Sequence, residues 1–167
     1  MSGVHARFIL AVSASPRGFA FVVFARPDQP FDWGVKEVRG NRKNARCLLA
    51  IKKLIREYRP EAVVIEETRA GSRRGPRIRA LYRAVVELAG REQVKIVQYT
   101  KAQVRAAFAA ENAWTRPEIA RAVAKRIPAF APRLPPLRKI WMSEDPRQSL
   151  FDAAALGAVF YAGSLKA

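Results

Sequence analysis

The chain has 167 residues, half of them hydrophobic, which fits one domain of ordinary size with a packed core rather than a disordered segment. Lys and Arg number 31 against 14 Asp and Glu, and the net charge of +17 is spread along the chain rather than confined to a tail. We therefore expect a polyanionic partner, with nucleic acid the commonest one, and a merely solvated surface as the alternative.

The chain contains one cysteine, Cys47, and one histidine, His5. This excludes an intrachain disulfide, a Cys/His zinc site and a Ser-His-Asp triad. Hydrolytic chemistry would have to come from carboxylates, hydroxyls, lysines or a hard metal ion. No apolar window is long enough for a membrane helix and no secretory signal is visible, so we expect a cytoplasmic protein with no membrane partner.

Three β-like runs open the chain, at residues 7–13, 19–25 and 32–39. The short polar turns between them indicate an antiparallel meander. Apolar residues then recur at helical spacing over 44–58, where a proline follows closely. The next run, EAVVIE at 61–66, is typical of a strand buried on both faces.

A loop rich in glycine and arginine, AGSRRGPR at 70–77, leads into an apolar-striped helix over 78–88. Another buried strand is expected at 94–99. Thr100 with Gln103, and Thr115 with Glu118, have the capping-box spacing that predicts the starts of two helices.

A basic, proline-rich loop is expected over 128–146, before a largely apolar helix over 148–165 that should pack against the sheet. Helices that alternate with buried strands in the second half require parallel pairing, whereas the first half supplies antiparallel neighbours. The sequence thus predicts an α/β fold within a single domain, 1–167. Its sheet would be mixed and five-stranded, three antiparallel strands followed by two parallel ones, with helices on both faces.

Two carboxylates are candidates for chemistry. Glu66 ends the buried run VVIE at the edge where α/β sheets bind ligands, and its alternative is a solvated strand end. Asp152 lies within the apolar SLFDAAALGAVFY, either as an acid favoured by the helix dipole or as a partner of Glu66. Carboxylates brought together in this way are what Mg²⁺ requires, and paired metals can hydrolyse phosphodiesters.

Four stretches taken in order give the sequence a family resemblance: ILAVSASPRGFAFVVF, VVIEE, YTKAQVRAAF and LFDAAALGAVFYA. Over residues 8–162 the chain resembles the RuvC-type Holliday-junction resolvases of the ribonuclease H-like superfamily. The resemblance implies a ribonuclease H-like fold, binding of branched or duplex DNA in recombination or repair, and a homodimer. It also implies Mg²⁺ or Mn²⁺ held by four acids, one ending the first strand, one the fourth and two near the start of the last helix.

Glu66 matches the acid of the fourth strand, and Asp152 matches one acid of the last helix. The companion of Asp152 falls on Ala155 or Ser149. Ser13 stands where the first-strand acid is expected, and its hydroxyl supplies no charge to balance a divalent cation. Glu144 or Asp145 would be a substitute ligand. With only Glu66 and Asp152 matched as metal ligands, we expect weak metal binding or none.

Basic residues form three candidate DNA contacts. One is the loop with Arg73, Arg74, Arg77 and Arg79 beside Glu66; the second is the cluster Lys36, Arg39, Arg42, Lys43 and Arg46 around the first helix start; the third is Arg138, Lys139 and Trp141. Their alternatives are a solvated basic loop and, for Trp141, an aromatic that anchors its loop.

Three functions remain open. The first is a RuvC-like protein that binds structured DNA with impaired or absent nuclease activity. The second is an active Mg²⁺- or Mn²⁺-dependent endodeoxyribonuclease that uses Glu66, Asp152 and Asp145. The third is a protein-assembly module on the same fold, since no GxxxxGK[ST] phosphate loop supports an ATPase.

Overall fold

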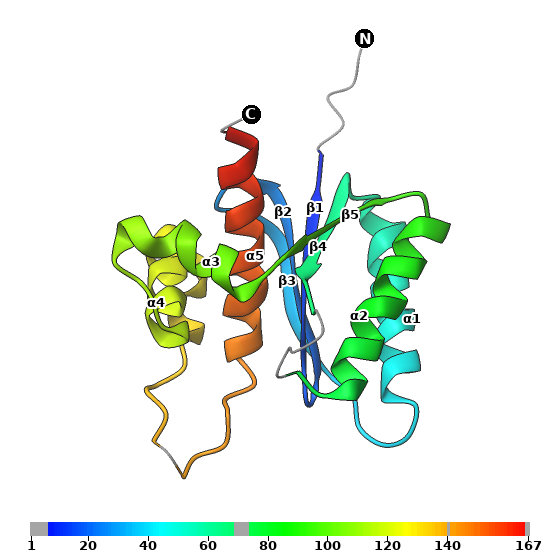
Figure 1. Ribbon diagram of the computed structural model, residues 1–167, viewed down its shortest axis with the longest axis horizontal. Coiled ribbons are helices and arrows are strands. Elements are labelled where there is room, and N and C mark those ends of the chain that lie inside the picture. Colours follow the sequence, from blue (N-terminus) through cyan, green and yellow to red (C-terminus); the bar gives the residue numbers. More distant parts are fainter. Residues whose placement is uncertain (1–6, 69–73, 140, 166–167) are drawn as a thin grey trace.

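The computed structural model describes residues 7–68, 74–139 and 141–165, and the side chains up to residue 163. Five strands form one sheet in the order β3-β2-β1-β4-β5 (Figure 1). The strands are β1 (Ile9–Ser15), β2 (Gly18–Arg26), β3 (Gln29–Glu37), β4 (Ala62–Glu66) and β5 (Lys95–Tyr99).

The sheet is mixed. Strands β1, β2 and β3 pair antiparallel, whereas β4 pairs parallel to both β1 and β5. The first three strands are joined by short turns, which suit antiparallel neighbours, and a helix lies in each connection from β3 to β4 and from β4 to β5. The fold class predicted from the sequence is confirmed.

Helices cover both faces of the sheet (Figure 1). The helices α1 (Lys43–Tyr58) and α2 (Pro76–Arg91) lie on one face, and α3 (Lys101–Phe108), α4 (Arg116–Arg126) and α5 (Gln148–Leu165) lie on the other. Two short 3₁₀ helices, η1 (Ala109–Glu111) and η2 (Pro128–Arg133), follow α3 and α4. Both predicted capping boxes are present, at Thr100 and Thr115.

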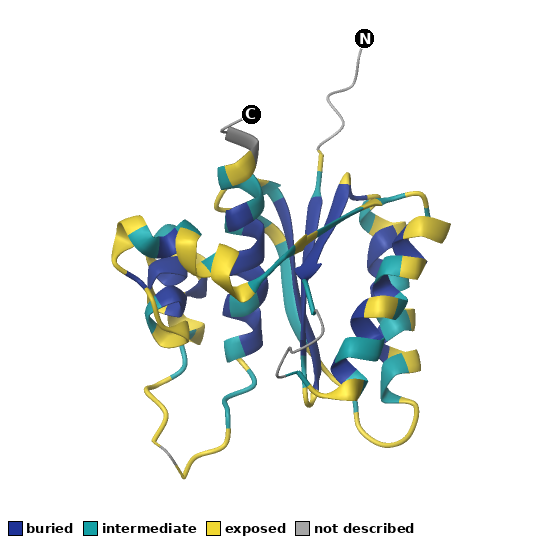
Figure 2. Ribbon diagram, viewed as in Figure 1, coloured by how far each residue is buried: buried dark blue, intermediate teal, exposed yellow. Residues whose placement is uncertain are grey.

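The core has two layers because side chains alternate across the sheet. On β1, Leu10 and Val12 pack toward α1 and α2, whereas Ile9 and Ala11 pack toward α5. Buried positions accordingly fill the three inner strands, β2, β1 and β4, and the sheet-facing side of the helices (Figure 2). No helix within the described ranges is long and apolar enough to cross a membrane.

Helix α5 approaches the sheet closely at Gly157. A Cβ atom at this position would lie 2.2 Å from the ring of Phe24 on β2. The predicted apolar helix is thus confirmed, and a glycine allows it to pack against an aromatic ring.

Two sequence predictions need correction. The sequence predicts a buried strand over 94–99, but β5 is an edge strand whose Lys95 and Gln98 are exposed. The expected loop over 128–146 begins with η2, whose Phe130 is fully buried and packs edge-on against Trp33. Pro128 is compatible with the first turn of a helix, and the buried ring of Phe130 outweighs Pro132 inside η2. Cys47 is buried in α1, whereas His5 lies outside the described residues.

Candidate functional site

Strand register brings Ser13 and Glu66 together. The parallel pairing of β1 and β4 ends at Ala11 and Val64, and Ser13 and Glu66 each follow two residues later, where both line one cavity. Both side chains take the sheet face that α5 covers, because Ala11 and Val64 do. Ser13 is 2% exposed and Glu66 is 8% exposed, so this edge of the sheet holds a buried hydroxyl next to a largely buried carboxylate.

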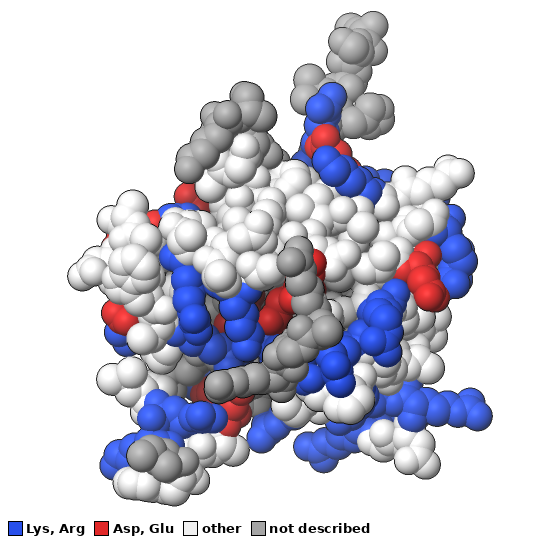
Figure 3. All heavy atoms as spheres, viewed as in Figure 1, with Lys and Arg blue, Asp and Glu red and all other residues white. Residues whose placement is uncertain are grey.

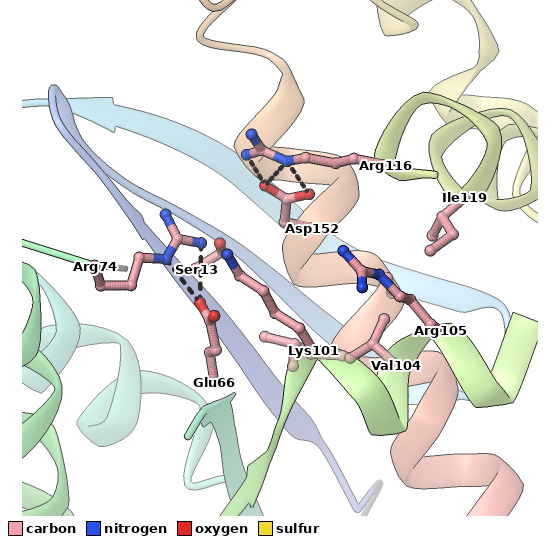
Figure 4. Close-up of a pocket in the computed structure, with 11 residues that line it drawn as sticks. Ser13, Glu66, Arg74, Lys101, Val104, Arg105, Arg116, Ile119 and Asp152 are labelled. Atoms are coloured by element: carbon pink, nitrogen blue, oxygen red, sulfur yellow. Dashed lines mark hydrogen bonds and ion pairs between the residues drawn. The ribbon is translucent and has the colours of Figure 1, made fainter. Parts of the chain in front are cut away.

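Ser13 and Glu66 line a cavity of about 170 Å³ between the sheet, α3, α4 and α5 (Figure 4). Asp152 also lines this cavity, so the sheet and the last helix bring both predicted metal ligands to one place. Four cations share the same walls: Arg74, Lys101, Arg105 and Arg116. We call this cavity, with its four cations and two carboxylates, the cationic pocket.

Glu66 is paired with Arg74. The guanidinium donates from Nε and Nη2 to Oε2 of Glu66, over 3.1 and 2.9 Å. Burial by itself would lower the pKa of Arg74, but the charge of Glu66 and its hydrogen bond leave that pKa above its ordinary value. The carboxylate is therefore held in a charge-assisted pair rather than turned toward open solvent.

Asp152 is paired with Arg116 of α4. Nε of Arg116 donates over 3.1 Å to both carboxylate oxygens, and Nη2 contacts Oδ2 as well. Glu144 binds the same guanidinium at 2.7 Å. Burial acts to lower the pKa of Arg116, but the hydrogen bonds and charges of Asp152 and Glu144 raise it overall. Gln148 completes the shell by donating to Oδ1 of Asp152 over 3.3 Å.

Lys101 and Arg105 enter the cationic pocket from α3 (Figure 4). They are four residues apart and therefore lie on one side of the helix. Both residues are exposed, and no carboxylate of the described chain forms an ion pair with either. They are the cations of the pocket that protein acids leave unneutralised.

The donor set does not fit a site for Mg²⁺ or Mn²⁺. Such sites require several anionic oxygens, whereas here Ser13 is neutral and each of the two carboxylates already binds an arginine. Within the described ranges, no three His, Cys, Asp or Glu side chains gather into a group able to hold a metal. Cations from the protein itself occupy the surroundings of both acids.

Asp145 lies elsewhere. It lines a second hollow of about 190 Å³ with Ser15 and Arg17, and binds Arg147 through Oδ2 at 2.7 Å. The hydrogen bond from the Arg147 side chain holds the pKa of Asp145 below its usual range. Of the two candidate companion positions, Ala155 lines the cationic pocket and Ser149 lines the second hollow.

The arginines of the basic loop differ in their relation to the cationic pocket. Arg73 lies outside the described residues, and Arg74 lines the pocket. Arg77 binds protein acceptors instead: its Nη2 donates to the carbonyl oxygen of Ser15 over 2.9 Å, and its Nη1 donates to Oδ1 of Asn44 over 2.9 Å. Arg79 is half-buried, and its Nε has no hydrogen-bond acceptor in the part of the chain that the structure describes.

The predicted cluster at the start of α1 is on the surface. Lys36, Arg39, Arg42 and Arg46 are exposed, whereas Lys43 is half-buried and donates to the carbonyl oxygen of Pro16 over 2.8 Å. Lys and Arg side chains gather across the lower half of the face shown in Figure 3, around a small acidic area.

Arg138, Lys139 and Trp141 are exposed in the segment between η2 and α5. Nζ of Lys139 lies 5.3 Å from the ring centroid of Trp141, within the range of a cation–π contact. Trp141 is 79% exposed, so it does not anchor this segment to the core.

Three residues of the cationic pocket were missed by sequence reasoning: Lys101, Arg105 and Arg116. A signal was available for the first two, since both occur at helical spacing in a helix that begins where β5 ends, at the same sheet edge as Glu66. Arg116 gave no local signal, because its partner Asp152 lies 36 residues away.

The fold is RuvC-like, with the mixed five-stranded sheet of the ribonuclease H-like fold. The chain is similar to the solved structure of Thermus thermophilus RuvC, with a TM-score of 0.67 and 19% identity over 94% of this chain and 96% of that one. It is similarly close to T. thermophilus RuvC in complex with a Holliday junction substrate, with a TM-score of 0.65 and 18% identity over the same shares. Comparison of the sequence with protein-family models and with curated proteins finds no match.

Proposed function

We propose that the protein binds nucleic acid, namely branched or duplex DNA, and that its nuclease activity is impaired or absent. The observation that carries this proposal is the cationic pocket: at the sheet edge where cleavage would need acids, two carboxylates are outnumbered by four cations. Protein cations near a phosphate favour its binding, but they do not activate a water as a pair of metal ions would.

The surroundings of the pocket support DNA as the ligand. Exposed cations of the α1 cluster lie on β3, on α1 and in the segment that connects them, and more line the pocket from α3. The solved structure of T. thermophilus RuvC with a Holliday junction shows that a protein of this fold binds branched DNA. Trp141, exposed beside Lys139, offers a ring on which a base at a junction can stack.

The test is a binding and cleavage series on labelled four-way, flapped and plain duplex DNA, with and without Mn²⁺. We expect complexes with DNA and intact strands under both conditions. Mn²⁺-dependent cuts that disappear in Glu66→Gln would contradict the loss of nuclease activity. Absence of binding to every one of these DNAs would contradict the proposal as a whole.

A further inference from the structure

The positive charge of the cationic pocket comes from side chains of the protein itself. We infer that this pocket is a metal-independent site for a phosphate group of the nucleic acid, in which guanidinium and ammonium groups stand where divalent metal ions would otherwise be expected. The inference rests on the proposed function and goes beyond it, because it names the chemical group bound, the residues that bind it and their independence of metal.

The two carboxylates act as positioning residues for arginines. Glu66 is largely buried at the end of a central strand and holds Arg74 through two hydrogen bonds. Asp152 and Glu144 together hold Arg116 between α4 and α5. A guanidinium fixed in this way loses less conformational freedom when it binds an anion, so the site is preorganised.

Donors remain for a ligand. Arg116 uses Nε and Nη2 on the acids, whereas its Nη1 has no acceptor within the described part of the chain. Lys101 and Arg105 add two cations that no described carboxylate neutralises. Glu66, Asp152 and Glu144 carry three negative charges against the four positive charges of the pocket, so a surplus of one positive charge remains for a phosphate.

The size and walls of the pocket suit the same ligand. Its volume of about 170 Å³ exceeds by more than tenfold the ~10–15 Å³ that one water requires. Val104, Ile119 and Leu156 form an apolar part of the wall. Apolar walls reduce competition from water and thereby strengthen charge-assisted hydrogen bonds to a phosphate oxygen.

The test measures the affinity of purified protein for a labelled duplex and a four-way junction, in chelator and in Mn²⁺. Arg105→Gln and Arg116→Gln are compared with Arg91→Gln. This control also removes one positive charge, but Arg91 is the last residue of α2, at the end of the helix away from the pocket. Arg105 is exposed and has no described carboxylate partner, so its substitution leaves the fold intact even if Arg116→Gln does not fold.

We expect wild-type affinity to be the same within about twofold in chelator and in Mn²⁺. Each pocket variant should weaken binding by about fivefold or more relative to Arg91→Gln and reduce the salt slope by about one. Glu66→Gln should retain or increase the affinity measured in chelator, because the amide oxygen can still accept from Arg74 while a negative charge beside the bound phosphate is removed.

Three outcomes would overturn the inference. If Mn²⁺ raises wild-type affinity about tenfold and Glu66→Gln abolishes the increase, the site binds metal. If wild-type protein binds DNA but the pocket variants equal Arg91→Gln, the phosphate lies elsewhere while the proposed function stands. If wild-type protein binds none of the DNAs, the proposed function fails and this inference fails with it.

A second comparison distinguishes the two sources of the phosphate. The same variants are measured on a duplex with and without a 5′-terminal phosphate. If the variants lose affinity equally for both duplexes, the pocket binds an internal phosphodiester. If they lose affinity only for the phosphorylated duplex, the pocket binds the 5′-terminal phosphate. Either result supports a phosphate site.

Discussion

Ser13 lies among charged side chains that the sequence alone does not identify as its neighbours. It lies just beyond the last paired residues of β1 and β4, at the same sheet edge as Glu66, and both residues line the cationic pocket. A carboxylate at this position would be a third acid in a cavity that now holds two. The neutral hydroxyl adds no negative charge beside the ion pair that Arg74 forms with Glu66.

Ser13→Asp should therefore create affinity for Mn²⁺. We expect the variant to bind Mn²⁺ at least about tenfold more tightly than wild type, a gain of about 1.4 kcal/mol, because charge count sets the affinity of oxygen sites for hard cations. Titration calorimetry measures this difference, and Ser13→Asn is the neutral control of similar size. Equal Mn²⁺ affinity in Ser13→Asp and Ser13→Asn would show that position 13 does not face the acids as the register requires.

Tyr82 lies beneath the same sheet edge, on the opposite face. Its hydroxyl oxygen accepts a hydrogen bond from the backbone N–H of Ala14 over 2.8 Å, and its side chain is fully buried. Burial, assisted by the charge of Glu66, raises the pKa of Tyr82 to about 12. The folded protein thus disfavours the phenolate at a pH where an unfolded chain would form it.

The stability of the protein should consequently fall at alkaline pH. Tyr82 contributes fully below its unfolded pKa of about 10, and its contribution is lost as the pH rises toward about 12. Denaturant unfolding at increasing pH should show this decline, and Tyr82→Phe should make it shallower. The pKa values of Tyr58 and Tyr161 are also raised to about 12, so these two residues should cause the part of the decline in stability that remains in Tyr82→Phe. An unchanged slope in Tyr82→Phe would contradict this assignment.

At the scale of elements, α5 depends on a single glycine for its closest approach to the sheet. Gly157→Ala would place its Cβ 2.2 Å from a ring carbon of Phe24, so the helix or the ring must move. Overpacking of this kind costs about 1–3 kcal/mol in the free energy of unfolding. Chemical denaturation measures the loss.

The same helix provides the matched control. A Cβ at Gly163 would come no closer than 3.9 Å to any neighbour, the hydroxyl of Tyr99. Gly163→Ala should therefore retain or raise stability, by up to about 1 kcal/mol through helix propensity. If both substitutions changed stability equally, close packing at Gly157 would not be the cause.

The sequence predicts elements better than it predicts their neighbours. Thr100 and Thr115 mark helix starts because a capping box is local, and Glu66 identifies its sheet edge because it ends a continuous apolar run. The exposure of β5 was not predictable, since it follows from the place of β5 at the end of the sheet, which the local sequence does not encode. The pairing of Arg116 with Asp152 requires α4 and α5 to be packed together first.

For the whole molecule, the excess of Lys and Arg should make the affinity for DNA depend strongly on salt concentration. Phosphate contacts release counterions, so about six such contacts would lower affinity on the order of a thousandfold between ~50 and ~200 mM salt. Fluorescence anisotropy with one duplex over this range measures the slope. A flat dependence would mean that the net charge of +17 serves solubility and not DNA contact.

The contacts of Arg77 connect the two basic regions of the protein, the cationic pocket and the cluster at the start of α1. Its guanidinium joins the carbonyl oxygen of Ser15 to the side chain of Asn44, and its own carbonyl oxygen accepts from Nδ2 of Asn44 over 2.9 Å. The start of α2 near the pocket is thereby fixed to the start of α1 with its surface cluster. Under the proposed function, these two areas, held at a constant separation, would engage one DNA as a bivalent ligand, and the gain would be avidity. Loosening this brace would weaken DNA binding without removing a single phosphate contact.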